Sequence, residues 1–154
     1  MITKEDFVGY NLAVKLKKKG FKDLCFAYYT NTNDLYFNYS HKAGAKYSDC
    51  YLSHNLMPKN SVSGKFVDAP TISQVLKWLR EEKKLYVVPL ICSDWSEDAD
   101  GIICEEWLFW SYQVININDG RIVYNEMDKI DNGNFENYEQ AALAGIEYVL
   151  DNLI

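Results

Sequence analysis

The sequence predicts an α+β protein with one antiparallel sheet of about five strands, packed with about three helices. Apolar residues recur at helical spacing near both ends of the chain and in its middle. Short segments between them alternate apolar and polar residues, as strands with one buried face do. These segments are joined mostly by turn sequences, which favours hairpins and therefore an antiparallel sheet with helices before and after it.

The first helix is expected to begin at Thr3, with Asp6 three residues later in a capping-box position. Its apolar face consists of Phe7, Val8, Leu12, Val14 and Leu16. The run Lys17–Lys19 places positive charge at the helix C-terminus, where the helix dipole favours it, and Gly20 ends the helix.

Two strands follow, over residues 24–29 and 35–39, and the polar run 30–34 between them predicts a hairpin. Residues 41–69 show no sustained period. A connection of this length in a compact domain is functional, partly ordered, or contains a short element of its own.

The second helix has the clearest signal in the chain, because Thr71-x-x-Gln74 matches a capping box. One apolar stripe follows at i, i+3, i+4 and i+7, formed by Ile72, Val75, Leu76 and Leu79. Residues 85–88 predict a strand, and Pro89 directs it to a sheet edge or a bulge.

Residues 94–106 predict an acidic loop, followed by a strand over 107–117. Asn118-Asp119-Gly120 indicates a hairpin turn into a return strand over 121–126, and residues 128–134 are polar and loop-like. The last helix is expected to be capped by Asn137, with an apolar stripe of Ala142, Ile146, Val149, Leu150 and Leu153. Gly145 inside it predicts a close approach to another element.

The composition bounds the class of protein. The chain has 154 residues, of which 48% are hydrophobic and 25% charged, so a single domain over 1–154 is expected. No apolar run approaches the roughly 20 residues that span a bilayer. Residues 1–6 lack the apolar core of a signal peptide, so we expect a cytoplasmic protein. The net charge of −6 disfavours a binder of double-stranded nucleic acid.

The net charge hides an asymmetry between the two parts of the chain. Residues 1–84 hold 14 Lys and Arg against 8 Asp and Glu, a balance of +6, whereas residues 85–154 hold 2 against 14, a balance of −12. Such a division indicates either charge complementarity within the fold or separate basic and acidic surfaces.

The sequence offers few metal ligands. Cys50-x-x-x-His54, with His41 upstream, has a metal-compatible spacing, but a structural zinc site needs four ligands and no second pair is present. Residues 96–101 partly match a calcium loop, but the position of the bidentate Glu is Trp107, so the sequence disfavours an EF-hand. Weak cation binding by Asp94, Asp98 and Asp100 in another geometry stays open.

No motif points to catalysis, because the chain lacks a nucleophile elbow, a Walker loop, a dinucleotide fingerprint and a zinc-protease helix. We therefore name no catalytic residue and no cofactor. Aromatic residues are abundant at 15%, and Tyr and Trp suit interfaces and sugar stacking. The candidate binding residues are Tyr36, Tyr39, Tyr47, Tyr51 and Trp95.

Several segments resemble one group of proteins. They are Ala69-Pro70-Thr71, Val75-x-x-Trp78-Leu79-Arg80-Glu81, the Leu85-Tyr86-Val87 strand, and the end segments Tyr138–Ala142, Ala144-Gly145-Ile146 and Leu153-Ile154. This pattern, together with Lys19-Gly20-Phe21, resembles small uncharacterised proteins of gut Bacteroidetes and of their phages and mobile elements. The resemblance implies an intracellular accessory protein and assigns no site residue.

Three functions are therefore open. The leading hypothesis is a non-enzymatic interaction protein that binds another protein or itself, because opposite charged surfaces favour association. The second is a small-ligand or oligosaccharide binder that uses a tyrosine-rich cleft. The third is an enzyme in which His41 or His54 faces a carboxylate within a pocket.

Overall fold

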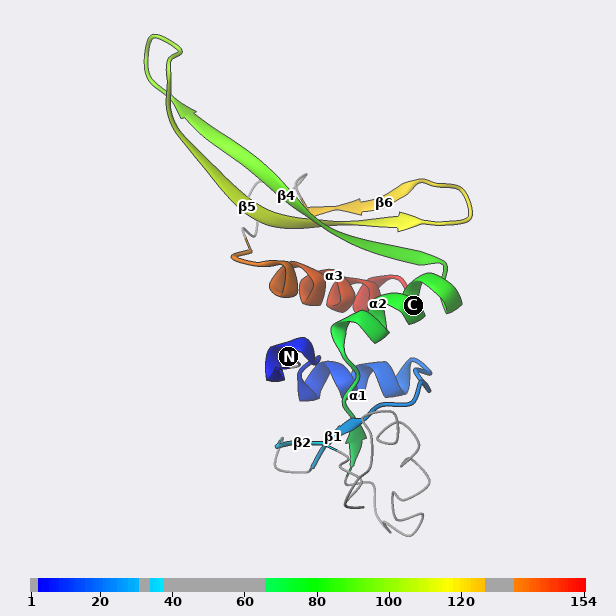
Figure 1. Cartoon of the computed structure of the whole chain (residues 1–154). Coiled ribbons are helices and arrows are strands. Elements are labelled where there is room, and N and C mark those ends of the chain that lie inside the picture. The colour runs from blue at the N-terminus through cyan, green and yellow to red at the C-terminus, as the bar shows by residue number, and fades with distance from the viewer. Residues whose placement is uncertain (1–2, 31–33, 38–65, 127–134) are drawn as a thin grey trace, which may run out of the picture. The chain divides into compact units, whose positions relative to one another are not determined.

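A computed structural model describes residues 3–30, 34–37, 66–126 and 135–154. The chain divides into two compact units, Met1–Trp78 and Leu79–Ile154. The expected α+β class is confirmed, since these residues form three α-helices and two three-stranded antiparallel sheets (Figure 1). The expected single sheet of about five strands is wrong, because the first hairpin and the second hairpin each take their own third strand. The single domain stays a prediction.

The first unit begins with a 3₁₀ turn, η1 (Lys4–Asp6), and the helix α1 (Tyr10–Lys18) starts only after it. The expected helix start at Thr3 is therefore wrong. The Thr3 amide donates to Asp6 Oδ2 at 2.5 Å, which closes a tight turn. Phe7 then leaves the helical region to form a bridge with Thr71, and its side chain is buried.

The small sheet of the first unit has the order β2-β1-β3, formed by β1 (Ala27–Tyr29), β2 (Leu35–Phe37) and β3 (Val67–Asp68). The predicted β1–β2 hairpin is confirmed. β3 is a short element within the long connection 41–69, and residues 41–65 of that connection lie outside the described residues.

Helix α2 (Ile72–Glu82) begins with the predicted capping box. The Gln74 amide donates to Thr71 Oγ1 at 3.2 Å, and the Thr71 amide donates to Gln74 Oε1 at 2.9 Å. Ile72, Val75 and Leu79 are buried as expected, and Trp78 is buried with them. The pair satisfies two amides that the first turn would otherwise leave without helical partners.

The sheet of the second unit has the order β4-β5-β6, formed by β4 (Leu85–Glu97), β5 (Ile103–Asn116) and β6 (Ile122–Asn125). β4 is an edge strand, as Pro89 predicts. The expected loop over 94–106 is wrong, because the β4–β5 ladder continues to the pair Glu97–Ile103. The aromatic residues of this segment favour a strand. Its acidic side chains are compatible with a strand because they are exposed to water.

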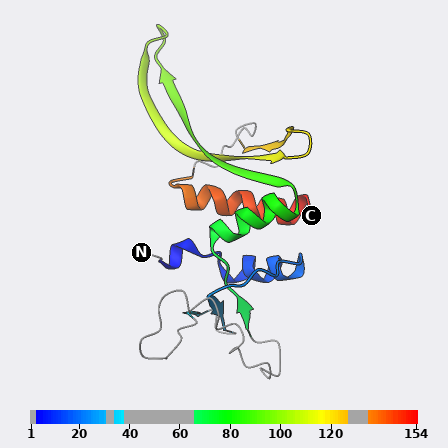
Figure 2. The same ribbon diagram turned by 45° about the vertical axis from the view of Figure 1, so that its right-hand side comes forward.

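Helix α3 (Tyr138–Asn152) lies along one face of this sheet (Figures 1 and 2). Asn137 Oδ1 accepts from the Gln140 amide at 2.9 Å, which confirms the predicted cap. A Cβ at Gly145 would lie 2.5 Å from Val87 Cγ1 and 2.9 Å from Tyr112 Cδ2, so the predicted close approach is confirmed. None of the described helices has both the length and the apolar character that a membrane crossing requires.

Candidate functional site

The outer part of the β4–β5 hairpin extends past the first residues of α3 (Figures 1 and 2). We call residues 91–108 the arm. At its base, Trp110 pairs with Ile91 of β4 and forms a bridge with Phe135 on its other side. In the part of the chain that the structure describes, no third strand pairs with the hairpin beyond Trp110. The arm is therefore a two-stranded ribbon, and Ile91–Glu97 alone rises roughly 20 Å.

One face of the arm continues the face of the sheet on which α3 packs. Residues directly opposite each other on paired strands share a face, and neighbours along a strand alternate. Gly145 of α3 approaches Val87 and Tyr112, which places α3 on the face of odd-numbered β4 residues and even-numbered β5 residues. Further along, the same face carries Ile91, Ser93 and Trp95 of β4, and Trp110, Leu108 and Glu106 of β5.

The cover provided by α3 ends at its first residue, Tyr138. The Tyr138 ring packs edge-on against the Trp110 ring, with 5.7 Å between the ring centroids. Past this contact, three large apolar side chains on the same face are exposed: Ile91 by 59%, Trp95 by 52% and Leu108 by 72%. Trp107, on the opposite face, is 39% exposed. Apolar side chains gathered in this way, rather than scattered singly, are typical of an interaction surface.

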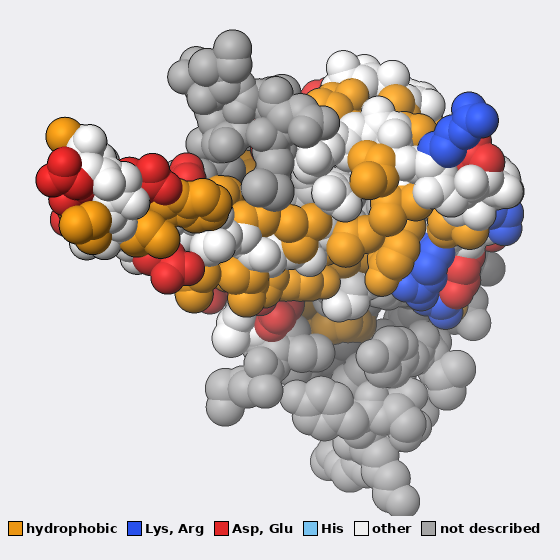
Figure 3. All heavy atoms as spheres, turned by 90° about the horizontal axis from the view of Figure 1, so that it is seen from above, with side chains coloured by type: hydrophobic (Ala, Val, Ile, Leu, Met, Phe, Trp, Pro, Cys, Tyr) orange, Lys and Arg blue, Asp and Glu red, His pale blue; other side chains and the backbone are white. Residues whose placement is uncertain are grey.

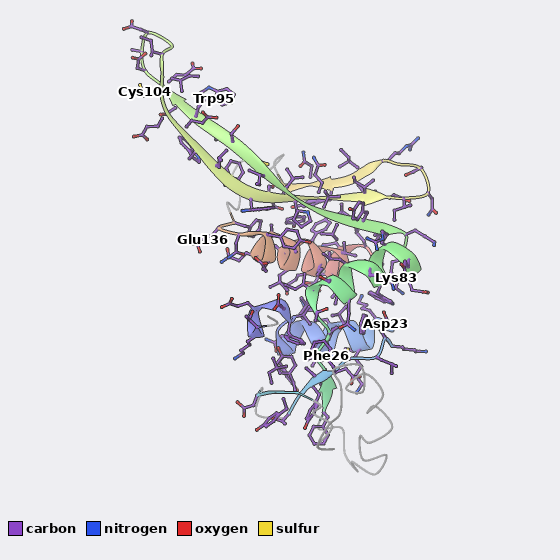
Figure 4. All side chains as sticks on the ribbon, in the orientation of Figure 1. Asp23, Phe26, Lys83, Trp95, Cys104 and Glu136 are labelled. Atoms are coloured by element: carbon purple, nitrogen blue, oxygen red, sulfur yellow. The ribbon has the colours of Figure 1, made fainter. Side chains whose placement is uncertain are left out.

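The Trp95 side chain is held in place although half of it faces water. Its indole Nε1–H donates to Glu97 Oε1 at 3.0 Å. Figure 4 shows Trp95 on the outer half of the arm, with Cys104 nearer the tip. A large aromatic side chain that is already oriented loses little conformational entropy on binding, which is why Trp is enriched among the residues that dominate interface energy.

Acidic residues accompany the apolar ones. The arm contains no Lys or Arg, and its six acidic residues are Asp94, Glu97, Asp98, Asp100, Glu105 and Glu106. Figure 3 shows the arm at the left with only hydrophobic, acidic and uncharged polar side chains on the visible face. All six are exposed, so the arm is a negatively charged, partly apolar surface.

The free edge of β4 is poorly suited to pair with another strand. The Trp110 amide donates to the Phe135 carbonyl oxygen at 3.0 Å and therefore points away from β4. Its partner Ile91 is then in a non-hydrogen-bonded pair, so the Ile91 amide points to the free edge of β4. The amides of the other odd-numbered residues of β4 point the same way. Pro89 has no amide hydrogen, and the Trp95 amide already donates to Asp94 Oδ1 at 2.9 Å. Proline and charged residues protect edge strands against pairing with other chains, so this edge of β4 is disfavoured as a binding surface.

The three aspartates proposed as cation ligands have other roles or positions. Asp98 Oδ1 accepts from the amides of Asp100 and Ile102, both at 2.9 Å, and so stabilises the turn over 98–102. Asp94 lies four residues away along the strand, roughly 13 Å, whereas calcium ligands lie at about 2.3–2.6 Å from the ion. Across residues 3–30, 34–37, 66–126 and 135–154, no three His, Cys, Asp or Glu side chains are grouped to hold a metal ion.

The structure places only two of the predicted binding residues. Trp95 lies on the arm, and Tyr36 lies on β2 in the other unit, where it is 46% exposed and stacks on Tyr28 at 5.8 Å. Tyr39, Tyr47 and Tyr51 lie outside the described residues, as do Cys50 and the two histidines. The tyrosine-rich cleft and the histidine-based site therefore stay predictions.

Tyr124 and Glu126 form a largely buried polar group in the second unit. The Tyr124 hydroxyl donates to Glu126 Oε2, and the Tyr124 ring stacks on Tyr148 of α3 at 3.7 Å. Burial raises the pKa of Tyr112, which stacks on Tyr124, and the negative charge of Glu126 raises that pKa further. Glu126 is only 7% exposed, so this group joins β5, β6 and α3 rather than forming an accessible site.

Sequence reasoning identified Trp95 but missed Ile91, Leu108 and Trp107. The apolar run 90–92 and the segment 105–108 lie on either side of Asp-Ala-Asp-Gly, where Gly101 has φ +78°. A glycine in this left-handed conformation is typical of a hairpin turn. Reading 98–102 as a turn would have extended both strands and identified these residues.

Comparisons with known proteins add no identity. A scan against protein-family models, a search of curated proteins and a search of solved structures each find no match. The resemblance to the Bacteroidetes group stays an expectation.

Proposed function

We propose that this chain is a non-enzymatic interaction protein and that the arm is its binding element. The observation that carries the proposal is the exposed apolar face formed by Ile91, Trp95 and Leu108, which begins where the cover of α3 ends. Covering a fully exposed side chain of this size releases about 1.5–3 kcal/mol, so a partner that covers three of them gains substantial free energy.

The construction of the arm supports this role. A two-stranded hairpin is marginally stable alone in water, and the arm is long for one. Its base is fixed by the sheet and by α3, its turn is closed by Asp98, and Trp95 is oriented by Glu97. A rigid base with an exposed, pre-oriented tip lowers the entropy cost of binding.

Site-specific photo-cross-linking tests the proposal. The photoreactive residue benzoylphenylalanine replaces Leu108 of the arm in the full chain, and in a matched control it replaces Ile122, which is 55% exposed on β6. Irradiation in the native host is expected to give one discrete protein adduct from position 108 and much less from position 122. Mass spectrometry then identifies the cross-linked protein.

Reconstitution with purified components completes the test. The identified protein is expected to bind the wild-type chain and to lose at least tenfold in affinity for Leu108→Ser, since that change removes most of one anchor's contribution. Ile122→Ser is expected to bind as the wild type does. The proposal is wrong if neither position gives a discrete adduct, or if both serine variants bind equally well.

A further inference from the structure

The charge on the arm and the lysines of α1 suggest which partner the arm binds. We propose that the arm of one molecule binds the lysine-rich end of α1 in a second copy of this chain. This inference rests on the proposed function of the arm and names its partner.

The lysine-rich end of α1 is the segment 15–22, which holds five lysines and no acidic residue. Lys17, Lys18, Lys19 and Lys22 are exposed. They are displayed because Leu12, Ala13 and Leu16 turn the opposite side of α1 into the core, and because Gly20, at φ +91°, ends the helix there. The lysines therefore form a compact positive surface of the first unit.

This surface also offers apolar contact. Leu24, just past the lysines, is 59% exposed, although the neighbouring Asp23 adds one negative charge. Lysine side chains pack their methylene stems against apolar surface while their ammonium groups reach water or a carboxylate. The lysine-rich end can therefore meet both properties of the arm: its carboxylates, and exposed side chains such as Trp95 and Leu108.

Charge decides against the other way of pairing two copies. If two arms packed together, each would bring its six carboxylates close to those of the other, with no lysine or arginine on either arm. Like charges in contact disfavour such a pairing, whereas arm against α1 brings six negative charges to five positive ones. The protected edge of β4 further disfavours joining two arms through β4.

The experiment measures the association of the purified full chain by sedimentation velocity, over roughly a fiftyfold range of concentration. We expect association at about 50 mM NaCl that weakens at least tenfold in about 500 mM NaCl, because salt screens exposed charge pairs. A wild-type chain that stays monomeric at low salt, or that associates more tightly in high salt, overturns the inference.

Charge reversal then identifies the two surfaces. The arm variant Glu105→Lys/Glu106→Lys and the α1 variant Lys17→Glu/Lys18→Glu are each expected to associate at least tenfold more weakly than the wild type. Mixing the two variants is expected to restore association, because each altered surface then meets its opposite on the other molecule. The control Glu81→Lys/Glu82→Lys makes the same charge change as the arm variant, but at exposed positions of α2, and is expected to leave association unchanged.

Folding is checked by circular dichroism and thermal melting for every variant. If acidic residues at the end of α1 lower its stability through the helix dipole, Lys17→Gln/Lys18→Gln replaces that variant and is expected to weaken association at least threefold. No recovery on mixing the reversed variants, or equal weakening by the α2 control, overturns the inference. A position-108 adduct with a different protein also overturns it while leaving the proposed function in place, whereas the absence of any adduct refutes both.

Discussion

Replacing Gly145 by alanine tests the packing of α3 on its sheet. In an open helix position this change stabilises a protein by about 1 kcal/mol, because alanine is the better helix former. Here the new Cβ would lie 2.5 Å from Val87 Cγ1 and 2.9 Å from Tyr112 Cδ2. Overpacking a core costs about 1–3 kcal/mol, and two buried side chains on paired strands place this site at the upper end. The net expectation is a loss of about 2 kcal/mol.

The assay is urea unfolding followed by circular dichroism, with a thermal melt in parallel. A loss of about 2 kcal/mol corresponds to about 4–8 °C in Tm for a chain of this size. Ala144→Gly, at the neighbouring half-buried position of α3, is the control and is expected to cost about 1 kcal/mol through helix propensity alone.

A double-mutant cycle with Val87→Ala separates contact from propensity. Val87→Ala removes the methyl group that Cβ meets, so the double variant is expected to be more stable than the sum of the single effects by about 1 kcal/mol or more. Gly145→Ala that raises stability by about 1 kcal/mol, or single effects that add within about 0.5 kcal/mol, would refute the packing argument.

Three further predictions follow from local contacts. Thr71→Ala is expected to lower the free energy of unfolding by about 1 kcal/mol, because the Gln74 amide loses its acceptor, whereas Ser73→Ala leaves urea unfolding unchanged. Iodoacetamide is expected to alkylate exposed Cys104 in the native protein but Cys25 only after unfolding. Burial of the Cys25 thiol raises its pKa to about 12, and the negative charges of Asp68 and Asp23 add to this effect. Equal labelling rates of the two cysteines would contradict this prediction. Stability is expected to fall between pH 9 and pH 12, by at most about 1.4 kcal/mol per pH unit for each group, because the unfolded chain ionises Cys25 and Tyr112 near their ordinary pKa values of 9.0 and 10.0 while the folded chain keeps both protonated. Tyr112→Phe is expected to flatten the fall above pH 10, and a Tm that is constant from pH 8 to 11 would contradict the assignment.

The elements predicted correctly from sequence are those whose signals are local. The capping box at Thr71, the N-cap at Asn137, the turn at Gly120 and the edge position implied by Pro89 each depend on neighbouring residues, and all are present. The start of the first helix failed for a tertiary reason. Phe7 is drawn into a bridge with Thr71, more than sixty residues away, and no local pattern contains that contact.

The sequence did not predict the arm because its composition is compatible with two structures. Six acidic residues around Gly101 are typical of a solvated loop, and alternating aromatic and polar residues are typical of a strand. The ladder from Leu85–Asn116 to Glu97–Ile103 resolves the choice, since an exposed ribbon accepts acidic side chains that a buried sheet would exclude.

The acidic residues of the arm also protect its exposed apolar face against pairing with other chains. An exposed apolar strand edge invites pairing with other chains, and charge is the usual protection against it. Asp94 accepts the outward amide of Trp95, and Glu97 holds the indole of the same residue. In the proposed interface, the carboxylates that repel a second arm are also the groups that attract a lysine-rich surface, so protection and recognition would follow from the same residues.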